Sequence, residues 1–201
     1  MDPRAVLPPA FLQRPVLEVA ADLLGRDLCV QADDAVLRVR LVDVEAYHQD
    51  ERGCHAYGGR RSARNASMFL CGGHSYVYFV YGMHWVLNLV TGAENEAAAV
   101  MLRGALPREG LATIATRRQL AQRRHAPKDP AQWLQGPAKL CQGLGIDRRH
   151  DGLELRPAQG LWLEAGQPVA PSQVTRGPRI GIDYAGADAA LPWRLRAATG
   201  R

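Results

Sequence analysis

Residues 75–90 restrict the fold of this chain more than any other segment, because they predict two strands joined by a very short turn. The run 75–80 is rich in aromatic and β-branched residues, Tyr81-Gly82 interrupts it, and a second such run covers 83–90. We therefore expect an antiparallel β-hairpin with Tyr81 at its tip. A large aromatic residue is unusual at a tight turn, and a wedge that enters stacked bases would need that position.

The second of these strands places a polar residue on an apolar face. Side chains alternate along a strand, so one face carries His84, Val86 and Asn88 and the other carries Trp85, Leu87 and Leu89. Asn88 therefore lies among mostly apolar neighbours. It could line a pocket, or it could tie down a neighbouring loop.

A carboxylate follows an earlier strand pattern. Apolar residues alternate with two arginines at Leu37, Val39 and Leu41, which is typical of a strand with one solvent-exposed face. If this alternation continues, Glu45 shares the face of the three apolar residues, where partial desolvation would make it a stronger base. The alternatives are a structural glutamate paired with an arginine, and a bulge that turns Glu45 outward.

The remaining elements indicate an α+β protein. We expect a helix over 15–24, strands at 28–30 and 97–103, a helix from Pro107 to about Leu120, a helix that opens at 136–141, and strands at 161–163 and 179–182. Residues 1–14 read as an extended lead-in, and the tail 185–201 as short and loosely held. With 201 residues the chain is long enough for one core and too short for two full domains, so we expect one domain over 1–201.

The excess of basic residues is compatible with a polyanionic partner. The net charge is +5 and the pI about 9.3, and basic surface binds phosphates by releasing their counterions. Arginines in the glycine-rich loop 48–64 could clamp phosphates, as could the free amides at the helix opening near Lys139. The alternatives are a solvated loop and, for Arg117, Arg118, Arg123 and Arg124, a favourable interaction with the dipole of their own helix.

The four cysteines predict no disulfide framework. Because they are scattered and no N-terminal apolar stretch precedes a cleavage site, we expect a reduced, cytoplasmic protein without a membrane span, associated with the nucleoid if the source is prokaryotic. Cys54, His55, Cys71 and His74 form a rival zinc constellation, although their spacing is poor for a tetrahedral site.

Several short motifs occur in collinear order between about Leu17 and Ile182. They are Val44-Glu45-Ala46-Tyr47, His55, Arg64-Asn65 with Met68-Phe69, Tyr78, Tyr81-Gly82-Met83, Asn88, Leu102-Arg103, Gly136-Pro137-Ala138-Lys139-Leu140-Cys141 and Arg179-Ile180-Gly181-Ile182. Together they resemble the alkyladenine DNA glycosylases, the 3-methyladenine DNA glycosylase family. The resemblance implies a single-domain α+β fold with a curved antiparallel sheet flanked by helices and a β-hairpin that inserts into DNA, and not a helix-hairpin-helix glycosylase.

The resemblance also implies a role for each matching residue. Glu45 looks like the general base, with Arg103 and the backbone carbonyl of Ile180 helping to hold the water. The damaged base would be held by Tyr47, His55 and Tyr78 as stacking walls, by Met101, and by Asn88, which excludes the 2-amino group of guanine. The DNA would be contacted by Tyr81 as the wedge and by Met83, His84, Met68, Arg60, Arg64 and Lys139.

The implied activity is monofunctional excision of damaged purines from double-stranded DNA, by a monomer that needs no cofactor and no metal. The substrate class is 3-methyladenine, 7-methylguanine, hypoxanthine and ethenoadenine, and the product is an abasic site. The chain departs from the mammalian pattern in four places. His84 stands where the mammalian pattern has a second aromatic wedge residue, and Met101 stands where it has a leucine. Two residues are added between Asn88 and Arg103, and the C-terminal tail is shorter. The alternative is a non-catalytic binder of damaged DNA or structured RNA, which would have no use for Glu45 beside a polyanion.

Overall fold

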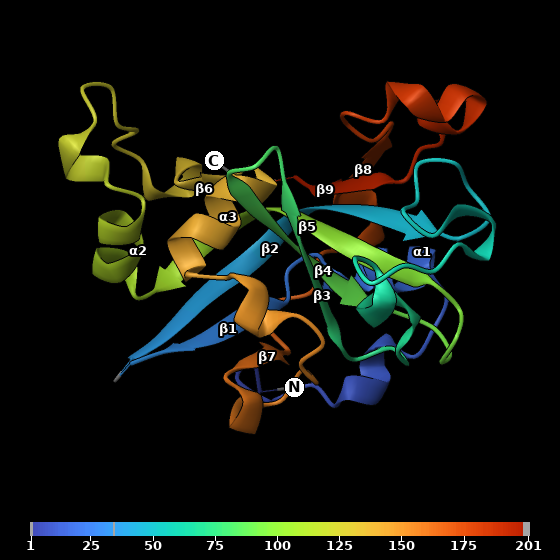
Figure 1. Cartoon of the computed structure of the whole chain (residues 1–201). Coiled ribbons are helices and arrows are strands. Elements are labelled where there is room, and N and C mark those ends of the chain that lie inside the picture. Colours follow the sequence, from blue (N-terminus) through green and yellow to red (C-terminus); the bar gives the residue numbers. More distant parts are fainter. Residues whose placement is uncertain (1, 34, 199–201) are drawn as a thin grey trace.

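A curved antiparallel sheet dominates the computed structural model, which describes residues 2–33 and 35–198 (Figure 1). In this part of the chain nine strands form one sheet with the main order β3-β4-β5-β2-β1-β7. The strands are β1 (Asp27–Ala32), β2 (Ala35–His48), β3 (Ser75–Val80), β4 (His84–Val90), β5 (Ala98–Glu109), β6 (Leu134–Gln135), β7 (Leu161–Glu164), β8 (Val174–Gly177) and β9 (Arg194–Ala197). Strand β6 pairs with β5, β9 with β2, and β8 with β9. The predicted α+β fold with a curved antiparallel sheet is therefore confirmed.

Three α-helices pack with this sheet in the described residues, namely α1 (Val16–Leu23), α2 (Leu111–Arg117) and α3 (Pro137–Leu144). They share one apolar core with the inner sides of the strands, and each contributes buried residues such as Leu23, Ile114 and Leu140. Figure 1 shows α3 beside the β3-β4 hairpin and α2 next to α3, on the side away from the hairpin. No helix of residues 2–33 and 35–198 is both long and apolar enough to cross a bilayer.

The predicted β-hairpin is present, and its alternation is as expected. Tyr78 lies opposite Val86 and Tyr76 opposite Asn88 in the β3-β4 register. Leu87 and Leu89 are buried in the main core, so His84, Val86 and Asn88 point to the other side of the sheet.

The prediction that Glu45 shares the face of Leu37, Val39 and Leu41 is wrong. The register of β2 against β5 shifts between Leu41 and Asp43 and again between Asp43 and Val44, which leaves Val42 and Arg103 as extra residues on their strands. Each bulge reverses the alternation that follows it. Val44 and Ala46 consequently enter the core, and Glu45 points to the opposite face together with Tyr47.

The predicted helix from Pro107 is also wrong at its start. Strand β5 continues to Glu109, because Pro107 and Glu109 still pair with β2 and the Glu109 carboxylate forms an ion pair with Arg38. Helix α2 begins only at Leu111, after Gly110 with a φ of 77°. A glycine is favoured there because an L side chain avoids this left-handed backbone.

Two predictions for the C-terminal region fail, each for its own reason. Residues 185–198 are held firmly: Arg194–Ala197 pairs with β2 and β8, and Leu195 is buried in the main core. Residues 179–182 do not form a strand: Ile180 and Gly181 form a bend, and Gly181 has a φ of 78°, which is far from extended backbone. Residues 199–201 of the predicted tail lie outside the described residues.

The lead-in is packed against the body. Met1 lies outside the described residues, Leu7 donates its N–H to the Leu163 carbonyl at 2.9 Å, and Pro9–Leu12 forms a 3-10 turn whose Leu12 is buried. These contacts make residues 2–14 part of the single folded unit.

Candidate active site

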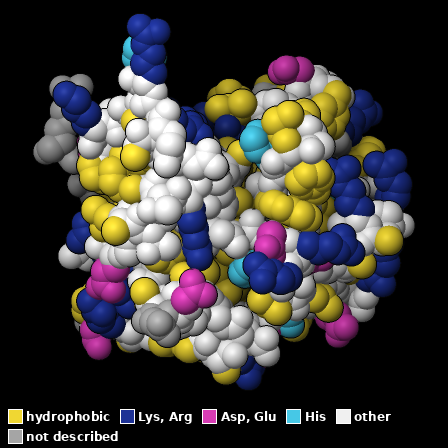
Figure 2. Space-filling model, turned by 60° about the vertical axis from the view of Figure 1, so that its left-hand side comes forward, with side chains coloured by type: hydrophobic (Ala, Val, Ile, Leu, Met, Phe, Trp, Pro, Cys, Tyr) yellow, Lys and Arg dark blue, Asp and Glu magenta, His cyan; other side chains and the backbone are white. Residues whose placement is uncertain are grey.

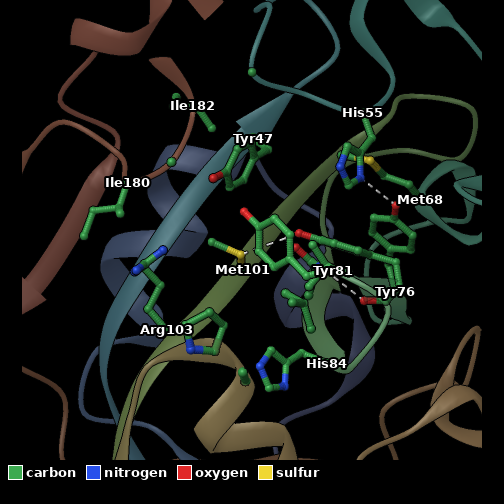
Figure 3. A pocket seen from close by; sticks show the side chains of 18 of the residues that line it. Tyr47, His55, Met68, Tyr76, Tyr81, His84, Met101, Arg103, Ile180 and Ile182 are labelled. Atoms are coloured by element: carbon green, nitrogen blue, oxygen red, sulfur yellow. Dashed lines mark hydrogen bonds between the residues drawn. The ribbon is translucent and has the colours of Figure 1, made fainter. Parts of the chain in front are cut away.

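A cavity of about 310 Å³ opens on the outer side of the hairpin (Figure 3), a size typical of small-molecule pockets. Its walls come from β2, β3, β4 and β5, from the start of α3, and from the 180–184 segment. Among the residues that line it are ten of the predicted site residues, namely Tyr47, His55, Met68, Tyr78, Tyr81, His84, Asn88, Met101, Arg103 and Ile180. The tertiary structure therefore brings together residues that are widely separated in sequence.

Aromatic rings form one side of this cavity. The ring centroids of His55 and Tyr78 lie 4.6 Å apart in an edge-on arrangement, and those of Tyr76 and Tyr78 lie 5.3 Å apart. His55 Nδ1 is 2.9 Å from the Tyr76 hydroxyl. Burial, together with the positive charges of Arg64 and Arg60, lowers the pKa of His55 to about 4, so the imidazole is neutral near pH 7. This side of the cavity thus presents uncharged rings to a ligand.

Glu45 lies directly behind the cavity wall, with a solvent-exposed fraction of 0%. Its Oε1 accepts a hydrogen bond from the Ile180 amide at 2.9 Å and lies 3.2 Å from Arg103 Nη1, and its Oε2 accepts from the Tyr47 hydroxyl at 2.8 Å. Burial and the charge of Glu45 raise the pKa of Tyr47, so that the phenol keeps its proton and donates it. Three groups of the cavity wall therefore hold one buried carboxylate.

The bulges explain why these partners meet. Arg103 is the extra residue on β5, and the bulge turns its side chain toward Glu45, in the way that bulges commonly re-aim a side chain beside an active site. Gly104 follows, where a Cβ would lie 2.7 Å from the Gln135 side chain and 3.2 Å from Asp43 Cβ. The close approach of strands at this point depends on the missing side chain.

Asn88 and Met101 lie opposite each other in the β4-β5 register and complete the polar edge of the cavity. The Asn88 amide donates from Nδ2 to the Tyr76 carbonyl at 3.0 Å. The Tyr78 hydroxyl lies 3.9 Å from the Met101 sulfur. Asn88 lines the cavity as one of its predicted roles requires. The alternative, that it ties down a neighbouring loop, does not hold for this bond, because Tyr76 lies in the paired strand β3.

Comparison with known proteins agrees with this geometry. The model of the methylpurine-DNA glycosylase family matches residues 10–200. The chain belongs to this family. It is 43% identical over 190 residues to a protein of Carboxydothermus hydrogenoformans, covering 94% of each chain, and 41% identical over 191 residues to one of Methanocella arvoryzae, covering 94% of this chain and 91% of the other. A protein of Streptomyces avermitilis is 43% identical over 195 residues, covering 96% of this chain and 87% of its own. All three carry the name "Putative 3-methyladenine DNA glycosylase". The chain is therefore a DNA glycosylase, and its substrate is DNA.

The hairpin tip of the glycosylase is exposed above the cavity. Tyr81 is 82% exposed and Met83 is also exposed, while His84 lines the cavity. Tyr81 has a φ of 54° and Gly82 one of 64°, as in hairpin turns whose two central residues are both left-handed. The tip thus holds a large aromatic side chain away from the core at some cost in backbone strain.

Met68 lies in the wall of the cavity and packs into the core behind it. It is buried in a second apolar cluster behind the cavity, together with Phe69, Tyr76 and Val90. The 3-10 turn Ala66–Phe69 packs against this cluster and leaves the Met68 side chain in the cavity wall. Met68 therefore lines the same cavity as Tyr81, and its contact with DNA stays a prediction.

The basic residues divide into structural and exposed groups. Arg117 donates to the Leu144 carbonyl at 2.7 Å and the buried Arg118 to the Trp133 carbonyl at 3.1 Å, so both tie α2 to the α3 region. The other basic residues singled out from the sequence are exposed, namely Arg60, Arg64, Arg123, Arg124 and Lys139. Lys and Arg side chains are spread among hydrophobic ones over the face seen in Figure 2 and do not form one patch.

The rival zinc constellation does not come together. His55 lies in the cavity wall, whereas Cys71 and His74 approach each other elsewhere with 3.8 Å between Sγ and Nδ1. Across residues 2–33 and 35–198, no three His, Cys, Asp or Glu side chains form a group that could hold a metal ion.

Sequence reasoning assigned no role to two residues that shape the site. Tyr184, which is 70% exposed, lines the cavity and donates its hydroxyl to the Gly53 carbonyl at 3.2 Å. Arg179 stacks on Tyr47, with its guanidinium carbon 4.6 Å from the ring centroid. Ile180 contacts Glu45 through its amide N–H, and the role of its carbonyl oxygen stays a prediction. Arg179 is the first residue of the quoted motif at 179–182 and Tyr184 follows that motif by two residues, and this position is the only sequence signal that points to either of them.

Proposed function

We propose that this glycosylase rotates an alkylated or deaminated purine out of duplex DNA into the cavity and hydrolyses its N-glycosidic bond with a water activated by Glu45. The product is an abasic site. The substrate class is 3-methyladenine, 7-methylguanine, hypoxanthine and ethenoadenine. The observation that carries the proposal is the buried Glu45 carboxylate, which is held by Arg103, Tyr47 and Ile180 at the wall of an aromatic cavity.

The cavity suits a flipped base for two physical reasons. A base inside a duplex hides its glycosidic bond, and extrusion costs a few kcal/mol, which the exposed Tyr81 offsets by filling the vacated stack. Within the cavity Tyr47, Tyr78 and His55 provide stacking faces. Purines that carry a positive charge after alkylation gain a further contribution of about 0.5–2 kcal/mol from the tyrosine rings.

The Glu45 carboxylate can both accept a hydrogen bond from the attacking water and stabilise positive charge on the sugar. An ionised carboxylate has about four acceptor positions on its two oxygens, and Oε2 of Glu45 receives one hydrogen bond from the described residues while Oε1 contacts two donors. Oε2 can therefore accept a further bond from water. As the base departs, the sugar gains oxocarbenium character, which the negative charge of Glu45 stabilises. Neither Lys128 nor Lys139 lines the cavity, which favours a hydrolytic over a Schiff-base route.

Asn88 supplies the filter against normal guanine. Its amide is fixed by the hydrogen bond to the Tyr76 carbonyl, so it cannot turn aside for a 2-amino substituent. Adenine-type lesions and hypoxanthine lack that group and fit against the amide. 7-Methylguanine keeps the 2-amino group, and its release relies instead on the positive charge from N7 methylation, which makes it a better leaving group than normal guanine.

The proposal is tested by Glu45→Gln, which keeps the size of the side chain and removes its charge. We expect single-turnover release of hypoxanthine from duplex DNA to be abolished, while the Kd for the same DNA changes little. Glu164→Gln is the matched control, because Glu164 is also a buried glutamate paired with an arginine, Arg38, on another part of the sheet. Equal loss of excision and binding in Glu45→Gln would make Glu45 a structural residue.

A further inference from the structure

Arg179 is a buried cation for which the proposed chemistry has no direct use. Its Nη1 donates to Glu51 Oε1 at 2.6 Å and to the Ala46 carbonyl at 3.0 Å. Its Nη2 donates to Glu51 Oε2 at 2.7 Å and to the Asp188 carbonyl at 3.2 Å. Both side chains of the ion pair are buried. Four bonds in the guanidinium plane fix its orientation, since Arg presents its donors in a rigid fork.

The faces of this guanidinium are also used. Its central carbon lies 4.6 Å from the ring centroid of Tyr47 and 5.2 Å from that of Trp193. Trp193 in turn accepts a hydrogen bond on its carbonyl from the Ala46 amide at 2.9 Å. Arg179 thus holds the backbone of Ala46, which lies between Glu45 and Tyr47, and fixes the plane of the Tyr47 ring.

The contacts of Arg179 hold the two groups that donate hydrogen bonds to the oxygens of Glu45. Oε2 is held by the hydroxyl of Tyr47, whose ring stacks on Arg179. Oε1 is held by the amide of Ile180, the residue that follows Arg179 in the chain. One guanidinium therefore positions a donor to each oxygen of the carboxylate, and the Tyr47 ring it fixes is also a wall of the cavity.

A second buried pair, between strands of the sheet, shows what a purely structural role looks like. Arg38 bonds Glu164 through two nitrogens, Nε at 2.8 Å and Nη2 at 3.1 Å, and both side chains are buried. Neither residue lines the cavity. The two pairs are alike in chemistry and burial, and they differ in what the arginine touches.

We propose that Arg179, held in place by Glu51, is a positioning residue that aligns Tyr47 and the Ile180 amide on Glu45 and so couples the base-stacking wall to the carboxylate. The inference rests on the proposed function, because it gives Arg179 a task only if Glu45 acts on the substrate. Loss of this alignment impairs the chemical step more than DNA binding, since small misplacements of a reacting group are costly in rate.

The test compares Glu51→Gln and Arg179→Lys with Glu164→Gln by single-turnover excision across a pH range, by Kd for lesion-containing DNA, and by Tm. We expect Glu51→Gln and Arg179→Lys to lower the saturating rate constant about tenfold or more, with a small change in Kd. The acid limb of the pH–rate profile should move to higher pH, because a carboxylate that loses a donor holds a proton more tightly. Glu164→Gln should lower Tm to a similar extent while rate and pH profile stay as in the wild type.

A double-mutant cycle provides a second test in case Glu51→Gln or Arg179→Lys folds poorly. Tyr47→Phe removes the hydroxyl that bonds Glu45 and keeps the ring, so its rate effect should be strongly non-additive with that of Glu51→Gln and additive with that of Glu164→Gln. Equal rate losses in Glu51→Gln and Glu164→Gln, or additive effects in both cycles, would reduce Arg179 to a structural residue. If excision survives in Glu45→Gln, the proposed function itself fails. If Glu45→Gln is inactive and Glu51→Gln is unaffected, only the role of Arg179 fails.

Discussion

Replacement of Tyr81 by glycine should make the protein more stable and its excision from duplex DNA slower. Tyr81 has a φ of 54° at the hairpin tip and is 82% exposed, so its side chain contributes little apolar burial. Removal of the Cβ relieves about 1–2 kcal/mol of left-handed strain, and the greater backbone freedom of glycine in the unfolded chain takes back about 0.5–1 kcal/mol. The net gain in the free energy of unfolding is therefore between zero and about 1.5 kcal/mol. Tyr81→Ala keeps the strain and should show no such gain.

The loss of function follows from the missing ring. A side chain that fills the vacated stack contributes about 1–3 kcal/mol of stacking, which corresponds to about 5- to 150-fold in the rate of excision from a duplex. A single strand has no intact stack to fill, so its rate should change little. Urea denaturation gives the stability difference, and single-turnover release of hypoxanthine from duplex and single-stranded oligonucleotides gives the rates. Equal rate losses on the two substrates would contradict the wedge role of Tyr81, and equal stabilities of the glycine and alanine variants would contradict the strain argument.

Three further predictions concern guanine discrimination by Asn88, the pH dependence of stability through His55, and DNA binding by Lys139. Asn88→Ala should raise the release of normal guanine about tenfold, because loss of a blocking group in a pocket changes discrimination by about 1–3 kcal/mol; unchanged guanine release from undamaged DNA would rule out Asn88 as the filter. The pKa of His55 is lowered from 6.5 to about 4 in the folded protein. As the pH falls, the unfolded chain therefore binds a proton on this imidazole before the folded protein does. The free energy of unfolding should fall by about 3 kcal/mol from this group as the pH drops from about 6.5 to 4. Denaturation of His55→Asn against pH should lack this part of the slope, and an unaltered slope would place the imidazole in a different environment. Lys139→Ala should weaken binding to damaged and undamaged DNA alike and reduce the slope of log K against log salt by about 1; a salt slope equal to that of the wild type would mean that Lys139 contacts no phosphate.

The sequence by itself determined the local elements that rest on short-range rules. The hairpin of residues 75–90 follows from β-branched and aromatic runs around Tyr81-Gly82, and the α1 helix from its apolar spacing before Gly25. Collinear motifs pointed to the family and to most of the residues that line the cavity. These features survive folding because neighbours in sequence already favour them.

The tertiary structure alone decided where Glu45 points and what surrounds it. A period-two pattern cannot reveal bulges at Val42 and Arg103, because each bulge depends on the pairing of β2 with β5, a partner far along the chain. The same holds for Leu195, whose pairing with Val44 anchors the predicted loose tail, and for Arg179, whose bonds to Glu51 and stacking on Tyr47 join separate segments. Long-range pairing and packing set these positions, and their energies depend on contacts that no local pattern contains.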